Sequence, residues 1–201
     1  PPRSVFENWY EHSPRKFLFV VKANRFITHM LKLTKPQEPV SRLFSSICAL
    51  QEKLGPILFQ LPPKWKVNIT RFKEFLEALP TGNRYVFEFR NETWYHKEIY
   101  QLLSDYNCAF CIYELAGHIS PMIITADFVY LRLHGPTALK YQGSYSNADL
   151  KNWAAQCVKW QKQKKDVFVY FDNDQDAYAA YNALMLKKLA EGSKGMKTKR
   201  H

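Results

Sequence analysis

The chain contains little glycine. It has seven glycines in 201 residues, and no predicted strand is followed by a glycine-rich loop. Such loops bring backbone amides close to phosphate groups in dinucleotide sites and P-loops, so their absence argues against both kinds of nucleotide site. Long apolar runs are missing too, since no stretch approaches the ~20 residues that cross a bilayer. No secretory signal is recognisable either. We therefore expect a cytoplasmic protein without a membrane partner.

Cysteines are few and poorly placed for disulfide or metal chemistry. Of the four, only Cys108 and Cys111 lie close together in sequence. Their segment has the character of a buried strand, in which residues three positions apart point to opposite faces. We therefore do not expect this pair to bind a metal or to act as a redox pair. Free buried thiols are typical of a reducing cytosol.

Positive charge is in excess, with a formal net charge of +11, but it is unevenly distributed. From Lys187 onward there are six Lys or Arg and one Glu, a net of +5, which leaves +6 for the rest of the chain. A second basic run, 159–165, is expected to cover the exposed end of a helix. We predict a single domain over residues 1–190, followed by a basic disordered tail over 191–201.

Hydrophobic periodicity predicts six strands, nearly all of them separated by helices. The predicted strands are 17–22, 57–61, 85–90, 108–113, 127–134 and 167–172, and the predicted helices are 4–12, 41–54, 69–79, 95–106, 147–162 and 174–190. Gly55 and Pro56 are expected to stop the second helix. This alternation favours a parallel sheet surrounded by helices. No nucleotide loop is present and the strands are rich in aromatic residues, which favours an α/β, (β/α) TIM-barrel-like fold. A complete barrel needs about 250 residues, so we expect six of the eight βα units.

Five of the predicted strands end in polar residues. Alternate side chains of a strand share a face, so Glu88 and Arg90 point to one face, and so do Arg132 and His134. The residues between them are apolar and would pack under helices. Parallel strands bring their carboxyl ends to one edge, where α/β proteins keep their active sites. The pattern therefore predicts a site at that edge.

Five motifs, in this order, resemble those of the YecE-like family, the domain-of-unknown-function family number 72. They are residues 17–29, residues 54–63, Glu88-Phe89-Arg90 with Trp94, residues 130–135, and residues 170–173. The resemblance covers residues 2–189 and implies a TIM-barrel-type fold. The family carries two further strands upstream of these motifs, so the resemblance implies an N-terminally truncated barrel with unpaired sheet edges. It implies no reaction, because the family's activity is not established.

Three residues are predicted to be catalytic: Glu88, His134 and Asp172. Arg90 would keep Glu88 ionised as a general base, although such a pair is also a common structural feature. His134 can exchange a proton near neutral pH, and Asp172 would orient one of the other two. Asp172 stands where the family often has Asn.

Nine further residues are predicted to contact a ligand: Lys22, Thr28, His29, Gln60, Arg90, Trp94, Arg132, Tyr141 and Asn173. The cations would hold an anionic group, and Gln60 would donate a hydrogen bond. Trp94 and Tyr141 would stack on a sugar or base, with plugging of a loop as the alternative role. For Thr28 and His29 the alternative role is to hold the loop in shape.

These residues favour a hydrolase or lyase that acts on a small or polymeric substrate with a phosphate or carboxylate group. The first alternative is a nucleic-acid-binding or processing protein that uses the basic run and tail. A glycoside hydrolase built on Glu88 and Asp172 is a third interpretation. No cofactor is predicted, and three nearby cations argue against a dedicated divalent-metal site. Unpaired sheet edges also suggest self-association.

Overall fold

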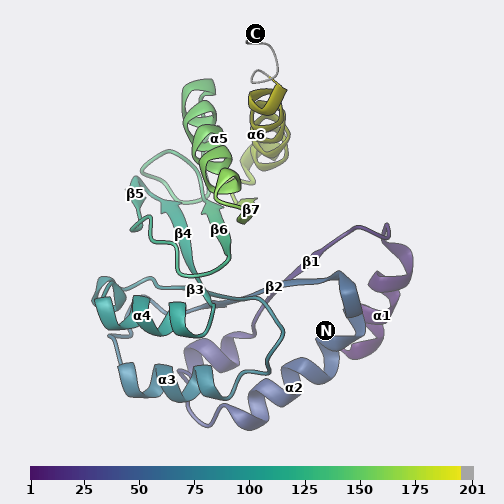
Figure 1. The fold of residues 1–201 in the computed structure, drawn as a ribbon, viewed down its shortest axis with the longest axis vertical. Coiled ribbons are helices and arrows are strands. Elements are labelled where there is room, and N and C mark those ends of the chain that lie inside the picture. Colours follow the sequence, from purple (N-terminus) through teal and green to yellow (C-terminus); the bar gives the residue numbers. More distant parts are fainter. Residues whose placement is uncertain (196–201) are drawn as a thin grey trace. The chain divides into compact units, whose positions relative to one another are not determined.

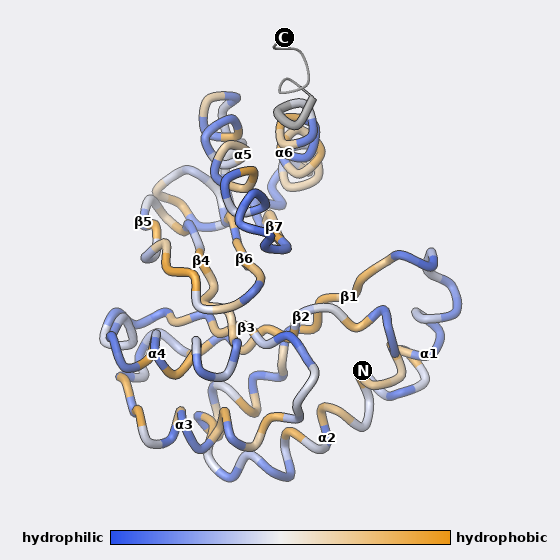
Figure 2. The backbone as a smooth tube through the Cα atoms, viewed as in Figure 1, coloured by the Kyte–Doolittle hydropathy of each residue, from blue (hydrophilic) through white to orange (hydrophobic). Residues whose placement is uncertain are grey.

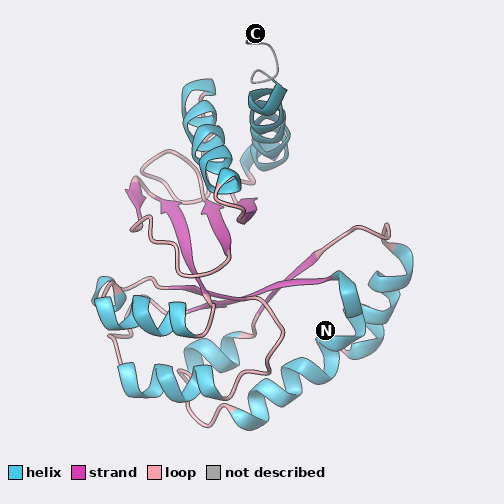
Figure 3. Cartoon of the chain, viewed as in Figure 1, coloured by secondary structure: helices cyan, strands magenta, loops and turns pink. Residues whose placement is uncertain are grey.

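Strands and helices alternate along the chain in the order that the sequence predicted (Figure 1, Figure 3). The computed structural model describes residues 1–195. Six of its strands pair in parallel, which gives an α/β fold of TIM-barrel type and confirms the predicted fold class. The described residues fall into two compact units, Pro1–Phe110 and a second that starts at Cys111.

The first unit contains three complete strands and the start of a fourth. Its elements are α1 (Arg3–His12), β1 (Phe19–Lys22), the π-helix η1 (Phe26–Met30), α2 (Gln37–Ile47), η2 (Cys48–Lys53), β2 (Leu54–Gln60), α3 (Ile69–Glu77), β3 (Tyr85–Glu88), η3 (Glu92–Trp94), α4 (Lys97–Asp105) and the first residues of β4 (Ala109–Leu115). The strands pair in the order β1-β2-β3-β4. Helices α2, α3 and α4 lie along one side of β1, β2 and β3 (Figure 1).

Aromatic residues fill the space between these strands and helices. Phe59 of β2 contacts Phe75 of α3 at 5.1 Å between ring centroids, and Phe87 of β3 contacts Phe72 of α3 at 4.9 Å. Phe59 and Phe87 are register partners, so they share one face of the sheet. Figure 2 shows the helices as mixtures of hydrophobic and hydrophilic segments, as expected when one side of each helix is buried. The opposite face of the strands is therefore the one that presents polar residues.

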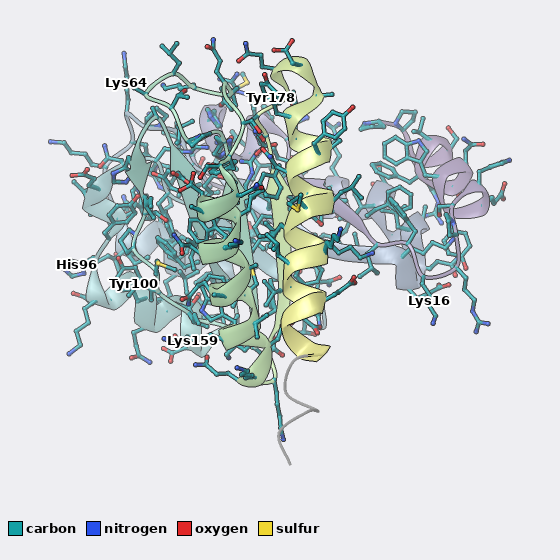
Figure 4. All side chains as sticks on the ribbon, turned by 90° about the horizontal axis from the view of Figure 1, so that it is seen from above. Lys16, Lys64, His96, Tyr100, Lys159 and Tyr178 are labelled. Carbon is teal, nitrogen blue, oxygen red and sulfur yellow. The ribbon has the colours of Figure 1, made fainter. Side chains whose placement is uncertain are left out.

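The second unit continues β4 and adds β5 (His118–Ile119), β6 (Phe128–Leu133), α5 (Asn147–Lys162), β7 (Asp166–Phe171), η4 (Gln175–Ala177) and α6 (Tyr178–Gly195). Here β4 pairs with β6, and β6 with β7, all in parallel. Ser146 and Asp149 form a capping box that starts α5. Helices α5 and α6 pack side by side. Figure 4 shows this pair of helices, with Lys159 labelled on α5 and Tyr178 labelled at the start of α6.

Several boundaries differ from those predicted. Gly55 and Pro56 were expected to stop a helix, but both lie within β2. Helix α2 ends earlier, at Ile47, and η2, which non-helical backbone at Gln51 interrupts, ends at Lys53. The antiparallel pairing of the two-residue strand β5 with β4 was not predicted. Helix α6 extends to Gly195, so the first residues of the predicted tail are helical, and residues 196–201 lie outside the described residues. None of the helices in residues 1–195 is long and apolar enough to cross a membrane.

Candidate functional site

The first unit brings Gln60, Glu88 and Arg90 together at the carboxyl ends of β2 and β3. Gln60 and Glu88 are register partners on neighbouring parallel strands, so they lie on the same face. The Gln60 Nε2 amide donates to Glu88 Oε1 at 2.8 Å, and Arg90 Nε forms an ion pair with the same oxygen. The Glu88 side chain has no exposed surface and that of Arg90 is 9% exposed. This cluster is therefore a buried, hydrogen-bonded ion pair.

Lys22, Thr28 and His29 lie at the end of β1 and in the π-helix that follows it. Thr28 is buried, and its Oγ1 shares a hydrogen bond of 2.9 Å with His29 Nδ1. The pKa of His29 is lowered by its partial burial, and by the positive charges of Arg25 and Lys22. The end of β1 is therefore a region of positive potential.

The second unit brings Arg132, His134 and Asp172 together. Asp172 Oδ2 lies 2.7 Å from Arg132 Nη2 and 3.2 Å from His134 Nδ1. Asp172 therefore lies on the Nδ1 side of the imidazole, and Nε2 is the ring nitrogen that does not face this carboxylate. The Asp172 side chain is 29% exposed, whereas that of His134 is 1% exposed. The three residues form a carboxylate held between a guanidinium and an imidazole.

The loop after β6 covers His134. The Tyr141 ring meets the His134 ring edge-on at 5.4 Å between centroids, and the Tyr141 amide donates to the His134 carbonyl. Gly135 starts this loop with a φ of +106°, which glycine adopts without strain. Its position also requires glycine, because a Cβ there would lie 2.2 Å from the carbonyl oxygen of Gln142. Tyr141 is half exposed and closes over the histidine.

Asn173 holds the end of the same loop. Its Nδ2 amide donates to the carbonyl of Gly143 at 2.8 Å and to Asn182 Oδ1 on α6 at 2.9 Å. Asn182 Oδ1 also accepts from the amide of Tyr145. Asn173 is fully buried. Asn173 therefore links the loop after β6 to α6.

Trp94 lies inside the first unit. Its indole has no exposed surface, is stacked on Phe89 at 5.1 Å, and donates from Nε1 to the carbonyl of Trp65. Trp65 also meets the ring edge-on. The residue therefore has the plugging role that was the alternative to ligand stacking.

Sequence reasoning missed a second carboxylate, the half-buried Glu114, because the predicted strand 108–113 ended one residue before it. Glu114 is on β4 and accepts hydrogen bonds from Tyr145 and from Trp153 of α5. The Tyr145 hydroxyl in turn accepts from the amide of Gly135 at 3.1 Å. Burial raises the pKa of Glu114, although the hydrogen bonds from Tyr145 and Trp153 oppose this effect. Glu114 thus supports the loop that covers His134.

Replacing Glu114 by glutamine is expected to change how stability depends on pH. Because the folded protein favours protonated Glu114, the wild type should lose stability, relative to Glu114→Gln, as pH rises from the ordinary value of 4.5 through the raised pKa. Urea unfolding of both proteins from about pH 4 to about pH 8 measures the difference. A difference in unfolding free energy that stays constant with pH would contradict the raised pKa.

The electrostatics of the two clusters bear on the predicted anion clamp. Arg90 is paired with Glu88, and Arg132 with Asp172, so each guanidinium already faces a carboxylate. This weighs against a clamp made from these two arginines alone.

Among the described residues no three His, Cys, Asp or Glu side chains are grouped so as to hold a metal ion. All four cysteines are free, and burial raises the pKa of Cys108 to about 12.

Comparisons with known proteins identify the family and agree with the fold. The model of the family described as "Protein of unknown function DUF72" matches residues 1–201. The UPF0759 protein YunF of Bacillus subtilis (strain 168) is 25% identical over 221 residues, which span 92% of this chain and 77% of YunF. A DUF72 family protein from Thermotoga maritima MSB8 is 26% identical with a TM-score of 0.84, covering 95% of this chain and 80% of its own. A DUF72 family protein from Enterococcus faecalis V583 shares the fold, with a TM-score of 0.84. It is 20% identical, and the match covers 95% of this chain and 80% of the other.

Proposed function

Because this chain belongs to the DUF72 family of proteins of unknown function, we propose a function from its own geometry: an enzyme that acts by general acid/base chemistry on an anionic substrate. His134 exchanges the proton, Asp172 orients His134, and Arg132 holds Asp172 in place. The reaction class is hydrolysis or elimination, in which one proton is removed from a nucleophile or carbon and one is given to a leaving group.

The observation that carries the proposal is the contact between Asp172 Oδ2 and His134 Nδ1 at 3.2 Å. A carboxylate in this position favours one tautomer of the imidazole and stabilises its protonated form during the reaction. Both residues follow parallel strands at their carboxyl ends, where TIM-barrel enzymes carry their catalytic groups. Since Tyr141 covers His134, substrate entry requires the Tyr141 loop to move.

The support for an anionic substrate is electrostatic. The chain has a formal net charge of +11, so its surface carries a net positive potential. Positive potential of this kind raises the local concentration of anions. We assign Glu88 to holding Gln60 and Arg90, because one of its oxygens is engaged by both.

The test is hydrolysis of chromogenic esters with a common leaving group. We expect turnover of 4-nitrophenyl phosphate or of the 4-nitrophenyl monoester of a dicarboxylic acid, and much less of 4-nitrophenyl acetate. In the His134→Gln and Asp172→Asn variants kcat/KM should fall by about 10²–10⁴-fold. His118→Gln is the matched control, since His118 is an exposed histidine of the same unit.

Two results would overturn the proposal. One is turnover of an anionic ester that survives in His134→Gln with kcat/KM unchanged. The other is the absence of turnover of every anionic ester by the wild type while circular dichroism shows it folded. Faster turnover of 4-nitrophenyl glycosides than of either anionic ester would instead favour the glycosidase. A glycosidase of this kind needs one protonated carboxyl group as its general acid. Glu88 and Asp172 each form an ion pair with an arginine, and a neighbouring positive charge favours the ionised carboxylate.

The second candidate function is binding of nucleic acid. The observation that favours it is the exposure of Lys159, Lys162 and Lys164 around the end of α5. Lys165 is less available, because its Nζ donates to the carbonyl of Ala126. Salt-dependent binding of single-stranded RNA that is equal in the wild type and in His134→Gln, without ester turnover, would favour this candidate.

Self-association through sheet edges remains a proposal. The outer edges of β1 and β7 pair with no other strand of the described residues. An unpaired edge presents backbone donors and acceptors that a second copy can use. Sedimentation velocity over a range of protein concentrations measures this association.

A further inference from the structure

A separate cavity lies in the first unit, formed by α1, β1, η1 and α2. Its volume is about 580 Å³, which lies within the range of small-molecule sites. The floor is apolar and buried: Phe6, Val21, Ile27 and Ile47 each have 9% exposure or less. Leu31 and Leu43 continue the apolar lining towards the surface. The cavity therefore offers a ligand a large hydrophobic contact area.

The rim of this cavity is positively charged. Lys22, Lys35 and Arg42 line it together with one carboxylate, Glu38, so three positive charges and one negative charge give a net of +2. All four residues are exposed. Within the part of the chain that the structure describes, neither Lys35 nor Arg42 takes part in an ion pair. The lowered pKa of His29, to which Lys22 contributes, reports the same positive potential at the adjoining π-helix.

We propose that this cavity binds an amphiphilic anion, a molecule with one apolar chain or ring system and a carboxylate or phosphate head group. The apolar part lies on Phe6, Val21 and Ile27, where its transfer from water provides most of the affinity. The head group stays at the rim, near Lys35 and Arg42, where it keeps part of its hydration. The combination selects against an uncharged chain and more strongly against a cationic one. This site uses neither His134 nor Asp172 and stands independently of the proposed enzyme activity.

Isothermal titration calorimetry with three ten-carbon probes tests the proposal: decanoate, decyl phosphate and decylamine, all below their aggregation concentrations. Decanoate and decyl phosphate should bind with one-to-one stoichiometry, and decylamine at least tenfold more weakly. The Lys35→Gln/Arg42→Gln variant should weaken decanoate binding by about fivefold to tenfold, the combined effect of two partly exposed charge interactions. A preference between the two anions identifies the head group.

Two variants separate the apolar from the charged contribution. Leu43→Trp places a larger side chain in the cavity and should abolish binding of all three probes, while Leu184→Trp, at a 68% exposed leucine of α6, should leave binding unchanged. Lys151→Gln/Lys159→Gln on α5 is the control for loss of two exposed charges. Thermal unfolding of each variant verifies the fold. Absence of decanoate binding to the folded wild type, equal binding of decylamine, or unchanged binding in Leu43→Trp would each overturn the proposal.

Discussion

Replacing Arg90 by methionine is expected to lower the free energy of unfolding by about 3–5 kcal/mol, because removal of one partner leaves a buried charge uncompensated. The remaining charge is Glu88, whose side chain has no exposed surface. Gln60 still donates to Glu88 Oε1, but one neutral amide replaces little of what a guanidinium provides. Urea unfolding monitored by tryptophan fluorescence measures the loss.

The double variant Glu88→Gln/Arg90→Met distinguishes an uncompensated charge from lost packing. With no charge left to bury, it should recover most of the stability, since buried ion pairs are often replaced at little cost. Arg3→Met is the matched control, because Arg3 pairs with Glu7 on the exposed surface of α1 and exposed pairs contribute little. If the double variant is as unstable as Arg90→Met, the loss comes from packing and not from an uncompensated charge.

Replacing Gly135 by alanine is the second large effect that we expect. At a φ of +106° an L-residue is strained by about 1–3 kcal/mol. In addition, the new Cβ would lie 2.2 Å from the carbonyl oxygen of Gln142, a backbone atom, so the loop must move. The displacement would carry Tyr141 away from the His134 ring. We expect a lower melting temperature together with a changed chemical shift of the His134 ring protons.

Gly117→Ala provides the comparison for this prediction. Gly117 also has a positive φ, +76°, but a Cβ there would meet no atom within 4 Å. It should therefore cost only the backbone strain and leave the His134 signals unchanged. Equal stability losses in the two variants, with unchanged His134 signals in both, would show that the loop absorbs the extra atom.

The sequence predicted which strand-end residues share a face, because the alternation of side chains along a strand is fixed by backbone geometry. Gln60 with Glu88, and Arg132 with Asp172, came together for that reason. Pairing was harder to predict. The alternation of side chains along the strand predicts the face on which Arg90 lies, but not the carboxylate that its long side chain reaches. The sequence alone therefore could not distinguish a clamp for a ligand from an internal ion pair.

Loop residues were the least predictable part. The direction of a loop side chain depends on turns that no periodic pattern encodes. Trp94 turned into the core, where Phe89 and Trp65 surround it, and Asn173 became a link between two segments. Glu114 was missed because it follows the apolar run of β4, and its partners Tyr145 and Trp153 lie far along the chain. The positions of side chains on strands were therefore predictable, whereas the directions of side chains on loops were not.

The hydrogen bond between Gln60 and Glu88 also bears on how the chain folds. In parallel strands a slip of one residue moves every side chain to the other face. A slip of one residue would expose the apolar residues of β2 and β3, so their burial disfavours it. A slip of two residues returns each side chain to its original face, so burial of the apolar residues does not disfavour it. Only one alignment places Gln60 opposite Glu88. The polar strand ends thus specify the alignment of the sheet as well as marking its carboxyl edge.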